Sequence, residues 1–476
     1  MSARTRELFG LLPVSLLVAA GFAAVLATRS EDVQDATITY GLVFLGLCVV
    51  AHVFIRARLA DADPYMFPLA ALLAAIGLVL IYRIDPELAR EQAQWFVVGL
   101  VFFCGTIVAI RDHHVLERYR YLIAAASIAL LVMPRLPGIG AQVNGAFLAI
   151  KLGPIQFQPA EFAKLGIIVF LASYLRETGD ILVRPRLRPL AWGSQALLYA
   201  VPVAAALLVI AVLGLGPAGS VLLLVFVGSL VAVLRERPSP KHFGPLLLVW
   251  GLAMLMLIFI RDLGSSLMFF GGFLALLYVA TGRLSLVGVG ATMFFGGAFF
   301  LARNVAHVQD RVDTWLDPFA RGVVDDEGYQ IAQSLFAQAD GGLFGQGFGQ
   351  ALLELPGGGT ILPAAHTDLI YSVLVNEAGL FGAAGLIGAY LLFVFRGLKT
   401  ALLAPDGFSK LLATGLTAVF ALQVFVIVGG VTKLIPLTGV TLPFVSYGGS
   451  SIVANFVLLA LLLLVSDRAR REVKGL

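Results

Sequence analysis

The sequence predicts an all-α polytopic membrane protein. Of its 476 residues, 59% are hydrophobic and only 13% are charged, about half the charged share of an average soluble domain. Apolar runs of roughly 17–25 residues recur along the whole chain, and each is long enough to cross the hydrocarbon core as a helix. These runs lack the polar alternation of a membrane-spanning strand, which excludes a β-barrel.

The candidate spans are segments of roughly 20 residues, the length that a helix needs to cross the hydrocarbon core. About fourteen such segments are predicted by this rule. They cover residues 9–27, 39–56, 66–83, 93–110, 119–134, 160–175, 192–214, 216–234, 243–260, 263–281, 285–302, 369–395, 411–432 and 448–466.

The distribution of basic residues predicts how these spans are oriented. If the N-terminus lies inside, every dense group of Lys and Arg falls in a cytoplasmic connection, as the positive-inside rule expects. Both termini are then cytoplasmic. Three unusual connections lie outside, at 135–159, 303–368 and 433–447.

The longest outer connection, 303–368, is much longer than an ordinary loop and carries an acidic stretch. Asp325 and Asp326 are followed at helical spacing by Gln330 and Ser334. A carboxylate beside the lipid interface can act as a general base if its pKa lies near the working pH. A solvated acidic turn explains the same residues, and the sequence leaves both interpretations open.

A glycine-rich stretch, GGLFGQGFG at 341–349, follows the acidic residues. No strand is predicted before it, so a nucleotide-binding fingerprint is rejected. Closely spaced glycines can present backbone amides to a phosphate as an anion nest. An ordinary flexible turn is equally consistent with the stretch.

Further charged residues are predicted near the same membrane surface. Glu161 and Lys164, in QFQPAEFAK, are three residues apart and share one helix face. Charges inside a span usually mark function, but a pair in the first turn could instead snorkel to the interface as a mutual ion pair. Asp262 directly precedes the span at 263–281 and supplies a second carboxylate.

A third group, His366, Thr367 and Asp368, stands at the start of the span 369–395. An aspartate is favourable at a helix start as a cap, so capping competes with a role in a site. One histidine beside one aspartate is too sparse for zinc, which needs three or four ligands. A hard divalent cation, Mg²⁺ or Mn²⁺, shared between carboxylates and a phosphate stays open. No other cofactor is expected.

These groups define a polar, acidic and glycine-rich site at the outer face of a helical bundle. Two classes of protein are consistent with it. One is an enzyme that acts on a lipid-linked substrate at the outer leaflet. The other is a transporter, in which polar groups and broken helices run through the bundle.

An ordered set of short motifs runs from about residue 66 to the C-terminus. They are NGA at 144–146, QPAEFAK at 158–164, RDLGSSL at 261–267, RVDTWLDP at 311–318, GYQIAQS at 328–334, GGLFGQGFG at 341–349, LPAAHTDLIY at 362–371 and LPFVSYGGSS at 442–451. With this set the chain resembles the SEDS family (shape, elongation, division and sporulation) of RodA, FtsW and SpoVE-like proteins, and most closely RodA. The family commonly has a tryptophan shortly after NGA, where this chain has Ala149.

The resemblance implies a SEDS-type helical bundle, with a ten-helix core and a large extracytoplasmic loop at 303–368. About four extra spans are added to that core by the span-length rule. Residues 1–65 are then an extra N-terminal transmembrane pair, and a second pair is inserted near 192–234 of the core at 66–476. The expected location is the bacterial plasma membrane.

The resemblance also implies an activity, that of a peptidoglycan glycosyltransferase. Such an enzyme would polymerise lipid II with inversion at the outer leaflet, for cell-wall synthesis during elongation or division. The family's catalytic aspartate stands just before GYQ, which makes Asp325 the first candidate for the base, Asp326 the second and Asp317 the third. The implied substrate-binding residues are Glu161, Lys164, Asp262, Arg311, Gln330, Ser334, His366, Thr367 and Asp368.

The implied partners are the membrane, undecaprenyl-linked lipid II and a class B penicillin-binding protein, which is a transpeptidase. Nucleic acid is not expected as a partner. Two alternatives to the enzyme remain open. The chain could be a lipid II flippase, or a non-enzymatic scaffold that activates the penicillin-binding protein.

Overall fold

A computed structural model describes residues 3–28, 34–136, 140–143, 146–152, 155–183, 262–304, 306–351, 353 and 361–475, with scattered positions between 200 and 251. The elements before the inserted region are α1 (Ala3–Thr28), α2 (Gln34–Arg58), α3 (Met66–Ile84), α4 (Pro86–Ala109), α5 (His114–Arg118), α6 (Arg120–Val132), the short 3₁₀ helix η1 (Met133–Arg135), β1 (Gly140–Val143), β2 (Ala146–Leu152), β3 (Ile155–Phe157) and α7 (Pro159–Val183). After it come α11 (Leu263–Thr281), α12 (Leu284–Asn304), α13 (Ala306–Leu316), α14 (Tyr329–Gly341), α15 (Ile370–Leu403), α16 (Gly407–Val431) and α17 (Gly449–Val473).

The structure forms helices at the predicted spans that lie in its described part. Eight helices of the described part are long and apolar enough to cross a membrane, namely α1, α2, α3, α4, α11, α15, α16 and α17. Helices α6, α7 and α12 coincide with three further predicted spans. The predicted spans at 192–214, 216–234 and 243–260, and with them the inserted pair, lie outside the described residues apart from scattered positions.

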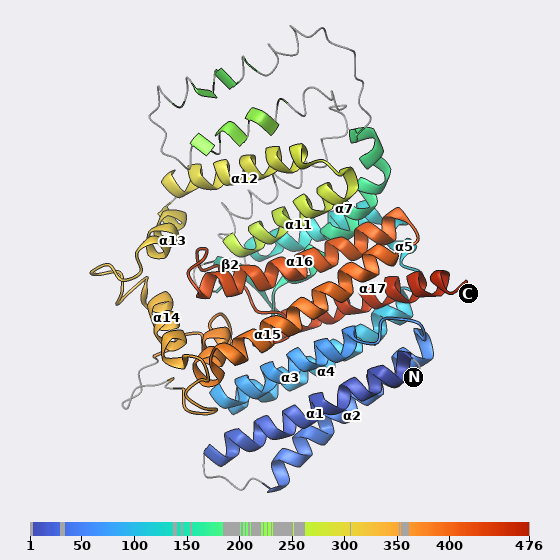
Figure 1. Ribbon diagram of the computed structural model, residues 1–476, viewed down its shortest axis with the longest axis vertical. Helices are drawn as coiled ribbons and strands as arrows, with labels where there is room; N and C mark the ends of the chain where they lie inside the picture. Colours follow the sequence, from blue (N-terminus) through green and yellow to red (C-terminus); the bar gives the residue numbers. More distant parts are fainter. Residues whose placement is uncertain are drawn as a thin grey trace.

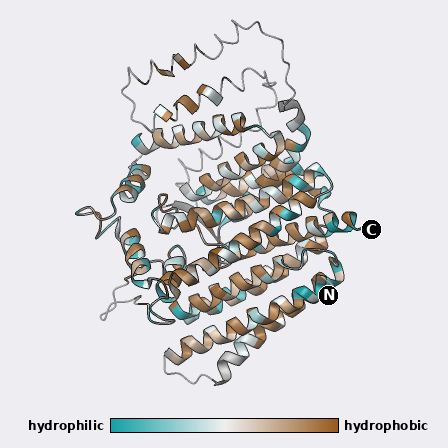
Figure 2. Ribbon diagram, viewed as in Figure 1, coloured by the Kyte–Doolittle hydropathy of each residue, from teal (hydrophilic) through white to brown (hydrophobic). Residues whose placement is uncertain are grey.

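The helices lie side by side as a bundle (Figure 1). At one edge α1 and α2 pack together, and α1 packs on α3; the series continues through α4, α17, α15, α16, α11 and α7. Hydrophobic residues line these helices along their length, whereas hydrophilic residues gather toward their ends (Figure 2). Both termini lie at one end of the bundle, here called the terminal end, and α13 and α14 lie at the opposite end, here called the loop end (Figure 1).

Helix α17 lies in the interior of this bundle. In its most apolar 18-residue window, 89% of the residues are buried. Phe456 of this helix makes edge-on ring contacts with Phe96 and Phe103 of α4 and with Phe444 of the preceding connection. Aromatic pairs of this kind add to the area that they bury, so these contacts fix α17 against its neighbours and against the chain that enters it.

Aspartate caps fix the starts of three helices. Asp85 accepts hydrogen bonds from the amides of Glu87 and Leu88 at the start of α4, where Pro86 occupies the first turn. Asp262 and Asp406 cap α11 and α16 in the same way. A side-chain oxygen at this position satisfies amides that have no partner within the helix, so the sequence determines locally where these helices begin.

The outer connection predicted at 135–159 contains a small antiparallel sheet of order β1-β2-β3. Gly140 pairs with Ile150, and Lys151 pairs with Gln156. The sequence did not indicate these strands, because they are short and lie between two apolar spans. Ala149, at the place of the family tryptophan, pairs with Ala141 and is buried.

Ion pairs gather at the terminal end of the bundle. The carboxylate of Asp63 is buried and accepts hydrogen bonds from Arg396 of α15 and Arg470 of α17. At the N-terminus, Glu7 of α1 contacts His52 of α2 at 2.8 Å. Buried charges cost free energy unless they are paired, so these contacts favour the observed packing of α1 against α2 and of the segment at Asp63 against α15 and α17.

Candidate active site at the loop end

A buried ion pair lies at the loop-end start of α7. Lys164 Nζ is 2.6 Å from Glu161 Oε2 and donates to Gln423 Oε1 of α16 at 2.7 Å. Gln423 in turn donates to the carbonyl of Thr441 at 2.8 Å. The predicted ion pair therefore forms, but snorkelling was wrong, because Glu161 and Lys164 are each only 2% exposed.

Asp262 lies close to this pair and caps α11. Its carboxylate accepts hydrogen bonds from the amide of Ser265 at 2.9 Å and from the hydroxyl of Ser265 at 2.5 Å. Burial raises the pKa of Asp262, and the negative charge of Glu161 adds to that rise, whereas the Ser265 hydrogen bonds and the positive charge of Arg311 oppose it. Asp262 therefore lies within electrostatic reach of both Glu161 and Arg311.

Arg311 connects the long connection 303–368 to the rest of the bundle. Its guanidinium donates to the carbonyl of Leu437 at 2.8 Å, and Trp315 of the same helix α13 donates to the carbonyl of Lys433 at 3.0 Å. Burial raises the pKa of Asp368 to about 6, and the nearby Arg311 opposes that rise. The connections 303–368 and 433–447 therefore meet at the hydrogen bonds that Arg311 and Trp315 donate.

The residues of the HTD motif pack against the connection that leads into α17. The amide of Tyr447 donates to the carbonyl of His366 at 2.8 Å, and their rings meet edge-on. Ser446 Oγ donates to the carbonyl of Thr367 at 2.6 Å. Burial lowers the pKa of His366, and the charge of Asp85 partly offsets this change.

The capping interpretation of the HTD motif is wrong. The residue at the N-cap of α15 is Leu369, and no side chain caps this helix. Asp368 stands one residue earlier, so its carboxylate is left to face Arg311 and the turn at Gly439. The outcome favours a role for Asp368 in the site over a role in starting the helix.

The acidic stretch lies in the connection between α13 and α14. Asp325 and Asp326 are exposed in this series of turns, which projects away from the bundle at the loop end (Figure 1). The turns close tightly, because the amide of Gly328 donates to the carbonyl of Val323 at 2.7 Å. Within the described part of the chain, neither aspartate carboxylate makes a hydrogen bond or an ion pair. The structure does not bring them onto the buried cluster.

Ser334 and Gln330 occupy the helix that follows. Ser334 is fully buried, and its hydroxyl contacts the hydroxyl of Ser372 at 2.7 Å and the carbonyl of Val431 at 2.9 Å. Gln330 is half-buried in the first turn of α14. Ser334 thus holds α14 against α15 and α16, and its hydroxyl is not directed toward open space.

The glycine-rich stretch docks on a kink in α15. The kink lies at Gly379, whose φ is +64°. The amides of Gln346 and Gly347 donate to the carbonyls of Asn376 and Glu377 at 2.8 and 3.1 Å. Because these amides already have partners, the anion-nest interpretation is wrong for them, and close backbone approach explains the glycines.

We predict that Gly345→Ala will destabilise this docking strongly. Gly345 has φ +81°, and a Cβ there would lie 2.1 Å from the carbonyl oxygen of Glu377. Gly347→Ala is the matched control, because its φ is also positive at +106° but its Cβ would meet only Gln350 at 3.5 Å. The left-handed backbone costs roughly 1–2 kcal/mol in both variants, so thermal unfolding should show a larger loss for Gly345→Ala. Equal losses would contradict the docking account.

The sequence analysis did not single out two residues that complete this end of the bundle. Gln423 was a lone polar residue in an apolar span, which is a signal of function or of a buried partner. Arg83, at the end of α3, lies with its Nε 3.1 Å from Glu377 Oε1 and donates to the carbonyls of Gly349 and Ala351. Arg83 therefore joins the kinked helix to the chain that follows the glycine-rich stretch.

The described residues do not by themselves form a metal centre at this end. Among the described residues, the one group of three or more His, Cys, Asp or Glu side chains close enough to hold an ion lies elsewhere, at the terminal end. Asp262, Asp368 and Glu161 can supply oxygen ligands only together with a further donor, such as a phosphate.

Fold and site together define a polytopic helical membrane protein with a buried polar cluster at one end, beside a long acidic loop. The family model described as cell cycle protein, which covers FtsW, RodA and SpoVE, matches residues 63–235 and 221–471. The chain belongs to this family.

Individual relatives agree with that assignment. Over 99% of this chain and 92% of its own length, the peptidoglycan glycosyltransferase RodA of Mycobacterium tuberculosis is 36% identical. The stage V sporulation protein E of Bacillus subtilis is 27% identical over 86% of this chain and 98% of its length. The expected greater similarity to RodA is thus confirmed.

Solved structures show the same fold. A chain from a peptidoglycan synthase complex, studied for its coordination of polymerization and crosslinking, has a TM-score of 0.60 at 26% identity and covers 86% of this chain and 98% of its own. The crystal structure of the rod shape determining protein RodA of Thermus thermophilus has a TM-score of 0.51 at 25% identity, with coverages of 86% and 97%. The predicted fold class is confirmed.

Proposed function

We propose that this chain is a peptidoglycan glycosyltransferase that polymerises lipid II at the outer leaflet. The observation that carries the proposal is the convergence of Glu161, Asp262, Arg311 and Asp368 at the loop end of the bundle. Family membership supports it, because relatives along nearly the whole chain bear the name of this activity. The protein is a multi-pass membrane protein of the bacterial cell.

In the proposed reaction, Asp325 takes the proton from the 4-hydroxyl of the acceptor sugar. The oxygen then attacks the anomeric carbon of the donor with inversion, and the lipid pyrophosphate leaves. A base contributes only within hydrogen-bond reach of the proton that it removes. The exposed turn that carries Asp325 would therefore have to meet the substrate above the buried cluster.

The leaving pyrophosphate needs positive charge. Arg311 is the candidate, since it lies between the outer loop and the bundle and is only partly buried. A divalent cation, Mg²⁺ or Mn²⁺, shared between Asp368 or Asp262 and the pyrophosphate would supply the same stabilisation. Lys164 is less suited, because Glu161 and Gln423 already occupy its ammonium group.

The orientation follows from the same proposal. The loop end would face outward and the terminal end would face the cytoplasm, with both termini inside. The dense basic groups support this arrangement, because Arg468, Arg470, Arg471 and Lys474 all lie at the terminal end. A class B penicillin-binding protein would act beside the chain, as the synthase complex with a similar fold suggests.

Polymerisation of labelled lipid II by the purified chain with its transpeptidase partner tests the proposal. Glycan strands, detected as a ladder on a gel, are the expected result. Lipid II that binds without any glycan would favour the flippase, whose function should depend on charges through the bundle. A chain that neither binds nor polymerises lipid II but still binds its partner would favour the scaffold.

The pKa of Asp368 gives a pH prediction. Because burial raises this pKa to about 6, the fold favours the neutral carboxyl. The stability that this provides is present below pH about 4 and is lost as the pH rises through about 6. The effect on activity has the opposite sign. If the reaction requires the Asp368 carboxylate, the polymerisation rate should fall as the pH drops below about 6.

Removing the charge of Arg311 tests whether the reaction uses the ionised form of Asp368. Arg311→Gln removes the charge that favours the Asp368 carboxylate. The acidic limb of the pH–rate profile, over which the polymerisation rate falls as the pH drops, should therefore move to higher pH. Arg321→Gln, on the exposed part of the outer loop, is the matched control and should leave the limb in place. If the natural chain, Arg311→Gln and Arg321→Gln all lose activity over the same acidic pH range, a role for the ionised Asp368 is contradicted.

A further inference from the structure

Two histidines and an aspartate converge at the terminal end, far from the candidate active site. His113 and His114 stand at the start of α5, and Asp406 caps α16. One ligand atom from each of the three lies within 4.8 Å of the others. The 25 residues of α16 separate this group from the loop end by about 37 Å, at 1.5 Å per residue. The group has no part in the proposed glycosyl transfer.

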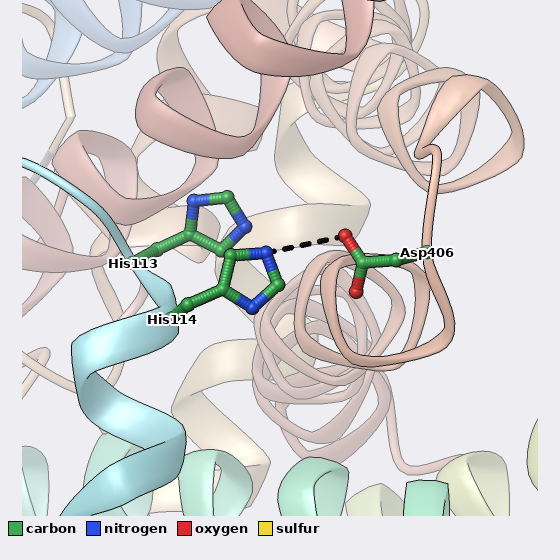
Figure 3. Close-up of side chains that lie close together, drawn as sticks. All are labelled: His113, His114 and Asp406. Atoms are coloured by element: carbon green, nitrogen blue, oxygen red, sulfur yellow. Dashed lines mark ion pairs between the residues drawn. The ribbon is translucent and has the colours of Figure 1, made fainter.

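The contacts within the group orient the ligand atoms. His114 Nε2 lies 3.3 Å from Asp406 Oδ2, and Figure 3 shows the two rings side by side with His114 facing the aspartate. His113 Nε2 lies 2.6 Å from the hydroxyl of Ser409, which also donates to Asp406 Oδ2 at 2.6 Å. His114 Nε2 therefore faces the carboxylate directly, and His113 Nε2 is linked to it through the Ser409 hydroxyl.

The opposite nitrogen of each ring faces a second carboxylate. His114 Nδ1 is 3.5 Å from Glu117 Oε2, and His113 Nδ1 is 3.9 Å from Asp112 Oδ1. Metal-ligating histidines generally direct their free ring nitrogen to a carboxylate or a carbonyl, which fixes the ring and its tautomer. Glu117 is within hydrogen-bond distance of His114 and supplies such support, whereas Asp112 acts on His113 only as a nearby charge.

We propose that His113, His114 and Asp406 form a binding site for a zinc-like transition-metal ion. Two imidazoles and one carboxylate are a common donor set for zinc, with a fourth position left for water. Ligand atoms about 2.0–2.1 Å from a tetrahedral zinc lie about 3.3 Å apart, which is the separation of His114 Nε2 and Asp406 Oδ2. A hard cation such as Mg²⁺ would prefer oxygen ligands throughout.

The site is open to the solvent at this end. A cavity of about 410 Å³ adjoins it, lined by His114, Glu117, Arg118, Arg120, Tyr121 and Glu177. An ion can therefore enter without opening the bundle. Once bound, it would join the short helix α5 to the start of α16, two segments that are distant in the sequence.

The competing explanation is a hydrogen-bonded cluster without metal, in which the Ser409 hydroxyl bridges His113 and Asp406. The two explanations differ in the role that they give to the Ser409 hydroxyl. A metal would replace the bridge, so Ser409→Ala should keep or strengthen zinc binding. The capping bond from the Ser409 amide to Asp406 is retained in that variant, because it is a backbone contact.

Zinc titration of the full chain tests the site. The chain would be purified without a histidine tag, stripped with a chelator and titrated with ZnCl₂ by calorimetry, and the bound metal would be counted by elemental analysis. We expect one zinc per chain and a higher Tm in its presence. His114→Gln should abolish saturable binding, Glu117→Gln should weaken it by about 10–100-fold, and His366→Gln should bind as the natural chain does.

Three outcomes would overturn the proposal. They are the absence of stoichiometric zinc in the natural chain, an unchanged affinity in His114→Gln, and an equal loss of zinc in His366→Gln. The Tm of each metal-free variant shows whether it is folded, and His113→Gln provides a second ligand variant if His114→Gln is not. Binding is the readout throughout, so the result is independent of the polymerisation activity.

Discussion

Replacing Asp325 with asparagine is expected to reduce glycan synthesis by about 10²–10⁴-fold, the usual contribution of a general base. The amide cannot accept the proton of the acceptor hydroxyl, although it occupies the same space. The carboxylate is exposed and makes no hydrogen bond within the described residues. Stability should therefore change by less than about 0.5 kcal/mol, and binding of the transpeptidase partner should be unaffected.

Asp326→Asn is the matched control, because it is the neighbouring carboxylate with the same exposure. Rates would be measured with labelled lipid II at saturating concentration. Loss of activity in Asp326→Asn alone would move the base by one residue. Full activity in both variants, and in Asp317→Asn, would contradict the assignment of the base to this loop.

Replacing Lys164 with methionine is expected to destabilise the fold by about 3–5 kcal/mol. The methionine fills a similar volume, but Glu161 is then left as a charge that is 2% exposed and has lost its ammonium partner. Gln423 also loses the donor to its side-chain oxygen. The measurement is chemical or thermal unfolding in one detergent, together with the polymerisation rate.

The double variant Glu161→Gln/Lys164→Met separates charge from packing. Removing both charges leaves no unpaired ion, so much of the lost stability should return. Activity should stay low in the double variant if the pair also shapes the site. If the single variant Lys164→Met is as stable as the natural chain, then Glu161 is not left as a buried, unpaired charge, and the prediction is contradicted.

The sequence predicted the bundle well, because the spans are long apolar runs and each of them forces a helix in lipid. It also predicted which polar residues gather at the loop end. Glu161, Asp262, Arg311 and Asp368 come from separate segments. The structure places Asp262 within electrostatic reach of Glu161 and Arg311, and Asp368 within reach of Arg311. Charges in or beside apolar spans are few, so each of them carried a strong signal.

The errors concern backbone details that depend on tertiary contacts. Asp368 was weighed as a cap because aspartate favours helix starts, yet the N-cap position of α15 is occupied by Leu369, one residue later. The amides of the glycine-rich stretch were weighed as anion donors, yet Asn376 and Glu377 accept from them. In both cases the deciding neighbour is remote along the path of the chain, so local spacing could not reveal it.

The acidic loop is the reverse case, in which the sequence motif identifies the candidate residues and the structure does not connect them to the buried cluster. Motif position identified Asp325 and Asp326, but the structure leaves them exposed and apart from the buried cluster. Among the described residues neither carboxylate has a hydrogen-bond or ion-pair partner, so in the proposed reaction the bound substrate would orient them. The loop is therefore the part of the proposed site that the substrate itself would complete.

Polymerisation in proteoliposomes tests the central claim most directly. Fluorescent lipid II would be placed only in the leaflet that contacts the loop end, and both glycan formation and movement of the label between leaflets would be followed. The proposed function predicts glycan strands from that leaflet, little transfer of label, and loss of the strands in Asp325→Asn. Transfer of lipid II across the bilayer without any glycan would contradict it.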